Sequence, residues 1–191
     1  DAPGGVYGVE VTVPALAARC NLGNLDPQHS EGRNVAACVA ALDCELPPDG
    51  ATLVTVRPDA DSVTAMAVIA MRALGQGGAI RRDRVATIGT ADSAPSGPWV
   101  RDYSPPADFA AVNAVAMNHR TPLASRISTL TDWLAGLGGL PMVAPSDHSA
   151  VDVQVSPCGR YAIARADGPA GRGAMAAGYR MAPVVIGVNE A

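Results

Sequence analysis

The pattern of hydrophobic and polar positions predicts a chain in which strands and helices alternate. Residues 5–13 alternate like a strand with one wetter face, and Pro14 ends this strand. A helix over 35–42 follows, and residues 51–57 form an apolar strand that leads into a helix over 62–74. The apolar positions of this last helix recur at helical spacing, which predicts one buried face. They are Val63, Met66, Ala67, Ala70 and Leu74.

Residues 84–90 contain a short, continuous apolar run, and we predict that they form the next strand. The order strand, helix, strand at these lengths is typical of a right-handed crossover between parallel strands. Residues 93–106 are rich in Pro, Ser and Gly, which predicts a loop. Its Trp99 and Tyr103 are compatible with a lid over a site and equally with a surface segment.

The C-terminal part of the chain changes to a β pattern. Two helices are predicted before it, one over 108–119 and one over 126–137 that Gly138 and Gly139 close. Residues 151–155 and 161–166 alternate like a hairpin, and residues 183–188 predict a final buried strand. We therefore expect one α/β domain over 1–191, whose mostly parallel sheet has flanking helices. A C-terminal hairpin would extend that sheet within a β-rich subregion at about 150–191.

Composition excludes several function classes. All 14 basic residues are Arg, which rules out lysine Schiff bases and a phosphate loop of the Walker type. A formal net charge of −4 argues against a nucleic-acid partner, because such binding needs a basic surface. The sequence has no apolar run of 18 residues and no N-terminal export signal, so we expect a cytoplasmic protein with no membrane partner.

Candidate metal ligands follow the predicted strands. Asp59 and Asp61 come directly after one strand, Asp92 after the next, and Asp26 and His29 lie in the loop after the first. The carboxyl ends of parallel strands form the ligand crevice of open α/β sheets, so these side chains are expected to converge. Carboxylates and imidazole suit Mn²⁺, Mg²⁺, Fe²⁺ or Zn²⁺, which would also relieve the repulsion between the acids. The sequence thus predicts a divalent metal as cofactor.

The same acids also have structural explanations. Asp61 or Ser62 could cap the helix that begins there, and Asp59 could be a turn residue after Pro58. Asp147 and His148 resemble a fragment of a metal motif but also suit an ordinary turn. These alternatives remain open at the level of sequence.

A metal-dependent hydrolase of a small polar molecule, phosphorylated or amide-containing, is the leading functional hypothesis. His29, Asp61 and His119 are the candidate catalytic residues, although His119 would equally suit a helix C-terminus. Arg57 and Arg120 could bind an anionic substrate through a bidentate guanidinium.

Two other function classes remain open. One is a non-catalytic module that binds a small anion or nucleotide through the Gly-rich segment 171–178, with the acids as helix caps. The other is a structural or assembly subunit, a homo-oligomer paired along the strand at 183–188.

Residues 56–62 (VRPDADS), followed by an Ala-rich helix, resemble the first motif of the DHH phosphoesterase superfamily. In that family a strand leads into Asn-Pro-Asp-Gly-Asp-Ala, so the resemblance implies that Asp59 and Asp61 are metal ligands. Residues 89–92 (GTAD) are similar to the family's second motif, which contributes a single Asp, here Asp92.

Two later segments extend this resemblance. Asp147, His148 and Ser149 resemble a shortened Asp-His-His motif, and residues 171–178 (GRGAMAAG) are similar to the Gly-rich segment of the family's substrate-binding module. The resemblance therefore implies a phosphoesterase whose substrate contacts Gly171 and Gly173.

Overall fold

The computed structural model describes residues 4–93, 107–141, 151–167, 178 and 181–190. The chain divides into two compact units, which contain the described residues before and after position 144. Helices and two small sheets are present, so the predicted α/β class is confirmed. The assignment of all 191 residues to one domain stays a prediction.

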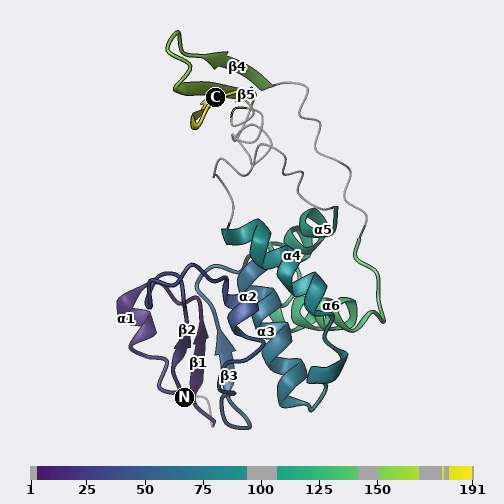
Figure 1. The fold of residues 1–191 in the computed structure, drawn as a ribbon. Helices are drawn as coiled ribbons and strands as arrows, with labels where there is room; N and C mark the ends of the chain where they lie inside the picture. The colour runs from purple at the N-terminus through teal and green to yellow at the C-terminus, as the bar shows by residue number, and fades with distance from the viewer. Residues whose placement is uncertain (1–3, 94–106, 142–150, 168–177, 179–180, 191) are drawn as a thin grey trace. The chain divides into compact units, whose positions relative to one another are not determined.

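The first unit is built on a parallel three-stranded sheet of order β2-β1-β3 (Figure 1). Its strands are β1 (Val6–Val9), β2 (Asn24–Leu25) and β3 (Thr52–Val54). β1 is central and shorter than the predicted 5–13, because Glu10 adopts a left-handed backbone with φ 52° that ends the strand. The parallel pairing confirms the predicted sheet type.

Gly8 allows the chain on one face of this sheet to approach β1 closely. A Cβ atom at Gly8 would lie 2.4 Å from Asn24 Oδ1 and 3.0 Å from Cys20 Sγ. The Asn24 amide needs this approach, since its Oδ1 accepts from Val11 N (3.2 Å) and its Nδ2 donates to Val11 O (3.1 Å). Asn24 thereby fixes the backbone that leaves β1, where Glu10 lies.

Helix α3 (Ala60–Ala73) is the core of the first unit, with eleven of its fourteen residues buried. It contacts β1 and the helices α2, α4, α5 and α6, which surround it in Figure 1. The core is aliphatic, as Met66, Ile69, Leu130 and Leu134 illustrate. The remaining helical elements are α1 (Pro14–Ala17), α2 (Ala37–Ala40), η1 (Gly77–Ala79), α4 (Arg82–Ser93), α5 (Ala107–Ala116) and α6 (Leu123–Ala135).

The strand predicted over 84–90 is wrong, because these residues belong to helix α4. Val85, Ile88 and Ala91 are fully buried, whereas Ala86 and Thr90 between them are exposed. That spacing is helical, and a short apolar run does not distinguish a strand from a buried helix segment. The predicted strand, helix, strand order therefore fails at its third element.

The other predicted helices are present with shifted ends. α2 covers only Ala37–Ala40 of the predicted 35–42, whereas α5 and α6 confirm the last two helices. Gly136 closes α6 in a left-handed conformation with φ 75°, in place of the predicted Gly138 and Gly139. The predicted lid residues Trp99 and Tyr103 lie outside the described residues.

The second unit contains a separate three-stranded sheet of order β4-β5-β6. β4 (Val151–Val155) and β5 (Tyr161–Asp167) form the predicted antiparallel hairpin, and β6 (Val184–Glu190) pairs parallel to β5. These strands hydrogen-bond to one another and do not extend the first sheet. β6 is not the buried strand that was predicted, since Val184 is 55% and Ile186 is 49% exposed. Within the described ranges, every helix is too short or too polar to cross a bilayer.

Candidate functional site

Carboxylates gather at the carboxyl edge of the parallel sheet. Glu10 directly follows β1, Asp26 directly follows β2, and Asp59 stands at the start of α3 after β3. The backbone N–H of Glu10 donates to Leu25 O at 2.9 Å, which holds the ends of β1 and β2 together. Because all three strands run in parallel, their ends bring the acids to one edge.

Glu10 is the residue at this edge that the sequence analysis missed. Burial, and then the negative charges of Asp61, Asp59, Asp92 and Asp26, raise the pKa of Glu10 to about 9. Among the described residues Glu10 is also the one non-glycine with a positive φ, a conformation that costs on the order of 1 kcal/mol. A half-buried acid with a left-handed backbone, within an acidic cluster, is typical of a binding site.

The alternation at residues 5–13 misled the prediction, because it placed Glu10 on the solvent-facing side of a longer strand. β1 ends at Val9, directly before Glu10, so Glu10 occupies a strand end instead of a solvent-facing strand position. A glutamate inside a mostly apolar segment and close to a proline was the available clue.

Asp61 holds two helices together. Its Oδ2 accepts from Ala37 N at 2.7 Å and its Oδ1 from Cys38 N at 2.8 Å, so it caps the N-terminus of α2 from α3. Ala36 at the N-cap position of α2 has no side chain that could do this. Burial raises the pKa of Asp61, while hydrogen bonds from Cys38 and Ala37 act in the opposite direction. Asp61 is thus primarily a structural carboxylate.

Asp59 is the N-cap of α3, where the sequence had suggested Asp61 or Ser62. Its Oδ1 accepts from Ser62 N at 3.0 Å, and Ser62 Oγ accepts from Asp59 N at 3.0 Å, which completes a capping box. Across the part of the chain that the structure describes, Asp59 Oδ2 makes no hydrogen bond. One carboxylate oxygen therefore remains available to a ligand.

Asp26 and His29 form a carboxylate–imidazole pair. His29 Nδ1 lies 2.8 Å from Asp26 Oδ1, and the His29 backbone N–H donates to the same oxygen at 3.2 Å. The Asp26 side chain is 3% exposed and that of His29 is 55% exposed. A carboxylate on Nδ1 favours the tautomer that carries its proton there, which leaves Nε2 as a proton acceptor at the surface.

Asp92 lies in the last turn of α4, although the sequence analysis placed it after a strand. Its Oδ2 accepts from Gln28 Nε2 at 3.2 Å, which ties α4 to the loop that carries Asp26 and His29. A carboxylate at a helix C-terminus is unfavourable because the helix dipole is negative there. Its position near other acids adds to the negative potential there, which a cation or a proton would reduce.

The remaining candidates are not part of this cluster of Glu10, Asp26, Asp59, Asp61 and Asp92. His119 and Arg120 are exposed after α5, and no contact among the described residues joins them to the carboxylates. Arg57 is exposed two residues before Asp59. Four candidates, Asp147, His148, Gly171 and Gly173, lie outside the described residues.

The donors suit a hard divalent cation in chemistry but are not arranged as a coordination sphere. Within the described residues, no three His, Cys, Asp or Glu side chains are placed to hold one ion together. Asp59 and Asp61 instead point oxygens at backbone N–H groups. The neighbouring carboxylates help to raise the pKa of Glu10, but a bound ion would need side-chain rotations to bring three of them onto it.

No family model, curated protein or solved structure matches the chain. The resemblance of residues 56–62 to the DHH motif therefore stays a hypothesis.

Asp61→Asn should destabilise the protein by about 2 kcal/mol or more, because an amide NH₂ would face a backbone N–H and leave a buried donor unpaired. Urea unfolding followed by circular dichroism measures this loss. The matched control is Asp49→Asn at an exposed turn position, which should change stability by less than about 0.5 kcal/mol. Equal stability of the two variants would show that the hydrogen bonds from α2 to Asp61 do not stabilise the fold.

Glu10→Gln should make the protein more stable than the wild type at pH 8. A folded-state pKa raised from 4.5 to about 9 means that the folded state binds the proton more tightly. The wild type therefore loses stability as pH rises from about 4.5 to about 9, and the variant does not share this loss. We expect a gain of at least about 1 kcal/mol at pH 8, since one pKa unit corresponds to about 1.4 kcal/mol.

The measurement is urea unfolding of both proteins from pH 5 to pH 9 without divalent cations. Glu45→Gln, at an exposed position, is the control and should follow the wild type at every pH. Parallel curves for the wild type and Glu10→Gln would show that Glu10 titrates normally.

Proposed function

We propose that the protein is a divalent-metal-dependent hydrolase of a small polar molecule. The observation that carries the proposal is the gathering of acids at the carboxyl edge of the parallel sheet, where four neighbouring carboxylates help to raise the pKa of Glu10. Such a site requires either a proton or a cation, and oxygen donors favour a hard divalent ion such as Mg²⁺ or Mn²⁺. The similarity of residues 56–62 to the DHH motif supports the same chemistry.

Glu10, Asp26, Asp59 and Asp92 would hold the ion. Asp59 offers the oxygen that its capping box leaves free, and Asp61 would position the cluster by anchoring α3 on α2. A bound divalent cation would supply Lewis-acid activation of water. His29 is the general base in this proposal, since Asp26 holds its Nδ1 and Nε2 is free to accept a proton from water.

Arg57 is the substrate-binding residue that the geometry supports. It is exposed beside Asp59, and its carbonyl accepts from Ser62 Oγ at 3.2 Å, which fixes its backbone at the start of α3. A guanidinium there would bind an anionic group of the substrate, such as a phosphate.

The second candidate function is a non-catalytic module that binds a small anion. The capping roles of Asp59 and Asp61 favour it, because they explain both acids without an ion. The protein would then use the acids only to start helices.

Two broader proposals concern cellular context. We place the protein in the cytoplasm because its four cysteines, Cys20, Cys38, Cys44 and Cys158, are all free thiols. A homo-oligomer would form along β6, the edge strand of its sheet, which carries the exposed Val184 and Ile186.

The wild type, incubated with Mn²⁺ and desalted, should retain about one ion per chain in elemental analysis. Asp59→Asn should lose the ion but stay folded, because asparagine caps a helix about as well as aspartate. His29→Ala should keep the ion and lose turnover of a p-nitrophenyl phosphodiester by about 100-fold, the usual contribution of a general base. Asp49→Asn is the control for both measurements.

Absence of stoichiometric ion in the wild type, with Mn²⁺ and equally with Mg²⁺, Fe²⁺ or Zn²⁺, would overturn the hydrolase proposal and favour the anion-binding module. An ion retained in Asp59→Asn would contradict the assignment of the cluster as its ligands.

A further inference from the structure

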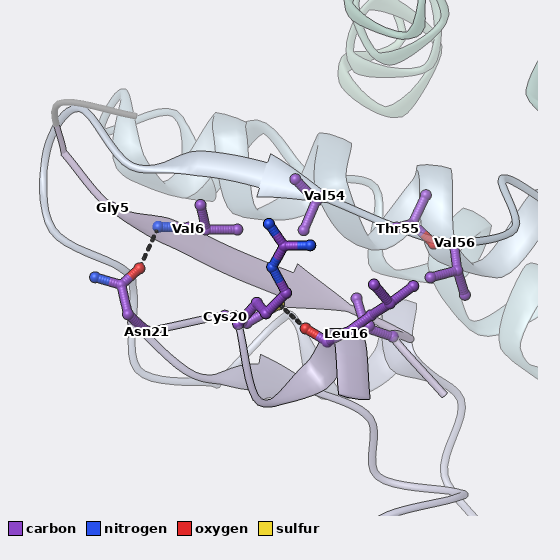
Figure 2. A pocket seen from close by; sticks show the side chains of 10 residues that line it. Gly5, Val6, Leu16, Cys20, Asn21, Val54, Thr55 and Val56 are labelled. Carbon is purple, nitrogen blue, oxygen red and sulfur yellow. Dashed lines mark hydrogen bonds between the residues drawn. The ribbon is translucent and has the colours of Figure 1, made fainter. Parts of the chain in front are cut away.

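A pocket of about 740 Å³ lies on the side of the first sheet that carries α1, as Figure 2 shows from close by. Val6 and Val54 contribute its floor from β1 and β3, and Leu16 of α1 forms part of its wall. Register explains the shared face: Val54 is the partner of Gly8, and Gly8 and Val6 point to the same side of β1. The volume is within the range of small-molecule sites.

The pocket exists because α1 covers the sheet poorly. α1 has four residues, none of them buried, and Leu16 remains 41% exposed. Val56, just beyond β3, also lines the pocket and is 38% exposed. Val11 completes the apolar lining. A ligand with an apolar body would remove these side chains from water, which is worth about 25 cal/mol per Å² of apolar surface.

The charged group beside this apolar lining favours a ligand that carries a negative charge. Arg19 lines the pocket, is exposed, and has no ion pair within the described ranges, where no acidic residue lines the pocket. A cation without a partner is notable in a chain of net charge −4. A guanidinium binds a carboxylate through two parallel hydrogen bonds.

Asn21 adds a hydrogen-bond donor to the lining, whereas the Thr55 hydroxyl is not accessible from the pocket. Thr55 Oγ1 is shielded from solvent, and among the described residues it has no hydrogen-bond partner, which costs about 1–3 kcal/mol for a buried polar group. Asn21 Oδ1 accepts from Val6 N at 2.8 Å, so its Nδ2 remains to donate (Figure 2).

We propose that this pocket binds a small amphipathic carboxylate, with the apolar body against Val6, Val54 and Leu16 and the carboxylate on Arg19 and the Asn21 amide. The site lies on the sheet face that carries α1, and no residue of the acidic cluster lines it. It goes beyond the hydrolase proposal and does not depend on an ion being bound.

Decanoate serves as the probe, titrated into the full chain by isothermal calorimetry at neutral pH. The wild type should bind one decanoate per chain. Arg19→Gln should weaken binding about tenfold, the loss of one charge-assisted contact, while Arg82→Gln on α4 should bind as the wild type does. Equal affinity in Arg19→Gln, or no saturable binding in the wild type, would overturn the proposal.

A second pair of variants locates the site. Leu16→Asp places a like charge in the pocket and should abolish decanoate binding. The control Val13→Asp changes another exposed hydrophobic side chain, at the N-cap of α1, where aspartate is favourable. It should retain the wild-type affinity within twofold, with circular dichroism confirming that both variants fold. Binding retained in Leu16→Asp, or lost equally in Val13→Asp, would place the ligand elsewhere and overturn the proposal.

Discussion

Parallel pairing of β1 with both of its neighbours is the constraint on which the candidate site depends. It brings the ends of three strands to one edge, where the sequence supplies an acid each time: Glu10, Asp26 and Asp59. Sheet geometry therefore forces negative charges together that would separate in an unfolded chain. Hydrogen bonds, a histidine or a bound proton offset the charge of individual carboxylates, and these interactions explain the local structure.

Backbone N–H groups at helix N-termini stabilise the charges of two of these acids. Asp61 receives backbone N–H groups at the start of α2, and Asp59 receives that of Ser62 at the start of α3. Helix N-termini carry partial positive charge, so both positions suit a carboxylate. Asp26 has His29 as its partner.

Glu10 and Asp92 do not lie at helix N-termini. Asp92 lies at the unfavourable end of α4, with Gln28 as a neutral donor. Glu10 is relieved by holding its proton, as its raised pKa indicates. A divalent cation could replace that proton, which is why the cluster suggests metal chemistry even though its helix caps are complete without an ion.

Sequence reasoning succeeded where a local pattern was long or unambiguous. The helical spacing from Val63 and the alternation of the β4–β5 hairpin predicted their elements correctly. The predicted single buried face was wrong, because α3 is buried on nearly all sides and Leu74, beyond its end, is 71% exposed. Sequence reasoning also failed for α4, because a short apolar run suits either a strand or a buried helix. Asp59 and Asp61 were found, but their division between capping α3 and capping α2 depends on a contact across 24 residues that no local pattern encodes.

Glu10 was missed for a related reason. Its importance arises from four acids distant in sequence and from a backbone conformation that ends β1 early. Both are tertiary properties. The open face beside α1 is equally invisible in the sequence, since it reflects what the fold leaves uncovered.

The most direct test of the central claim is the titration of the Glu10 side-chain carboxyl by ¹³C NMR, with and without Mg²⁺. We predict a pKa near 9 in the free protein, a lower pKa in Asp59→Asn, where one neighbouring charge is removed, and a marked fall when Mg²⁺ is added. A Glu10 carboxyl that titrates near 4.5 and responds to neither change would contradict a site built on crowded carboxylates.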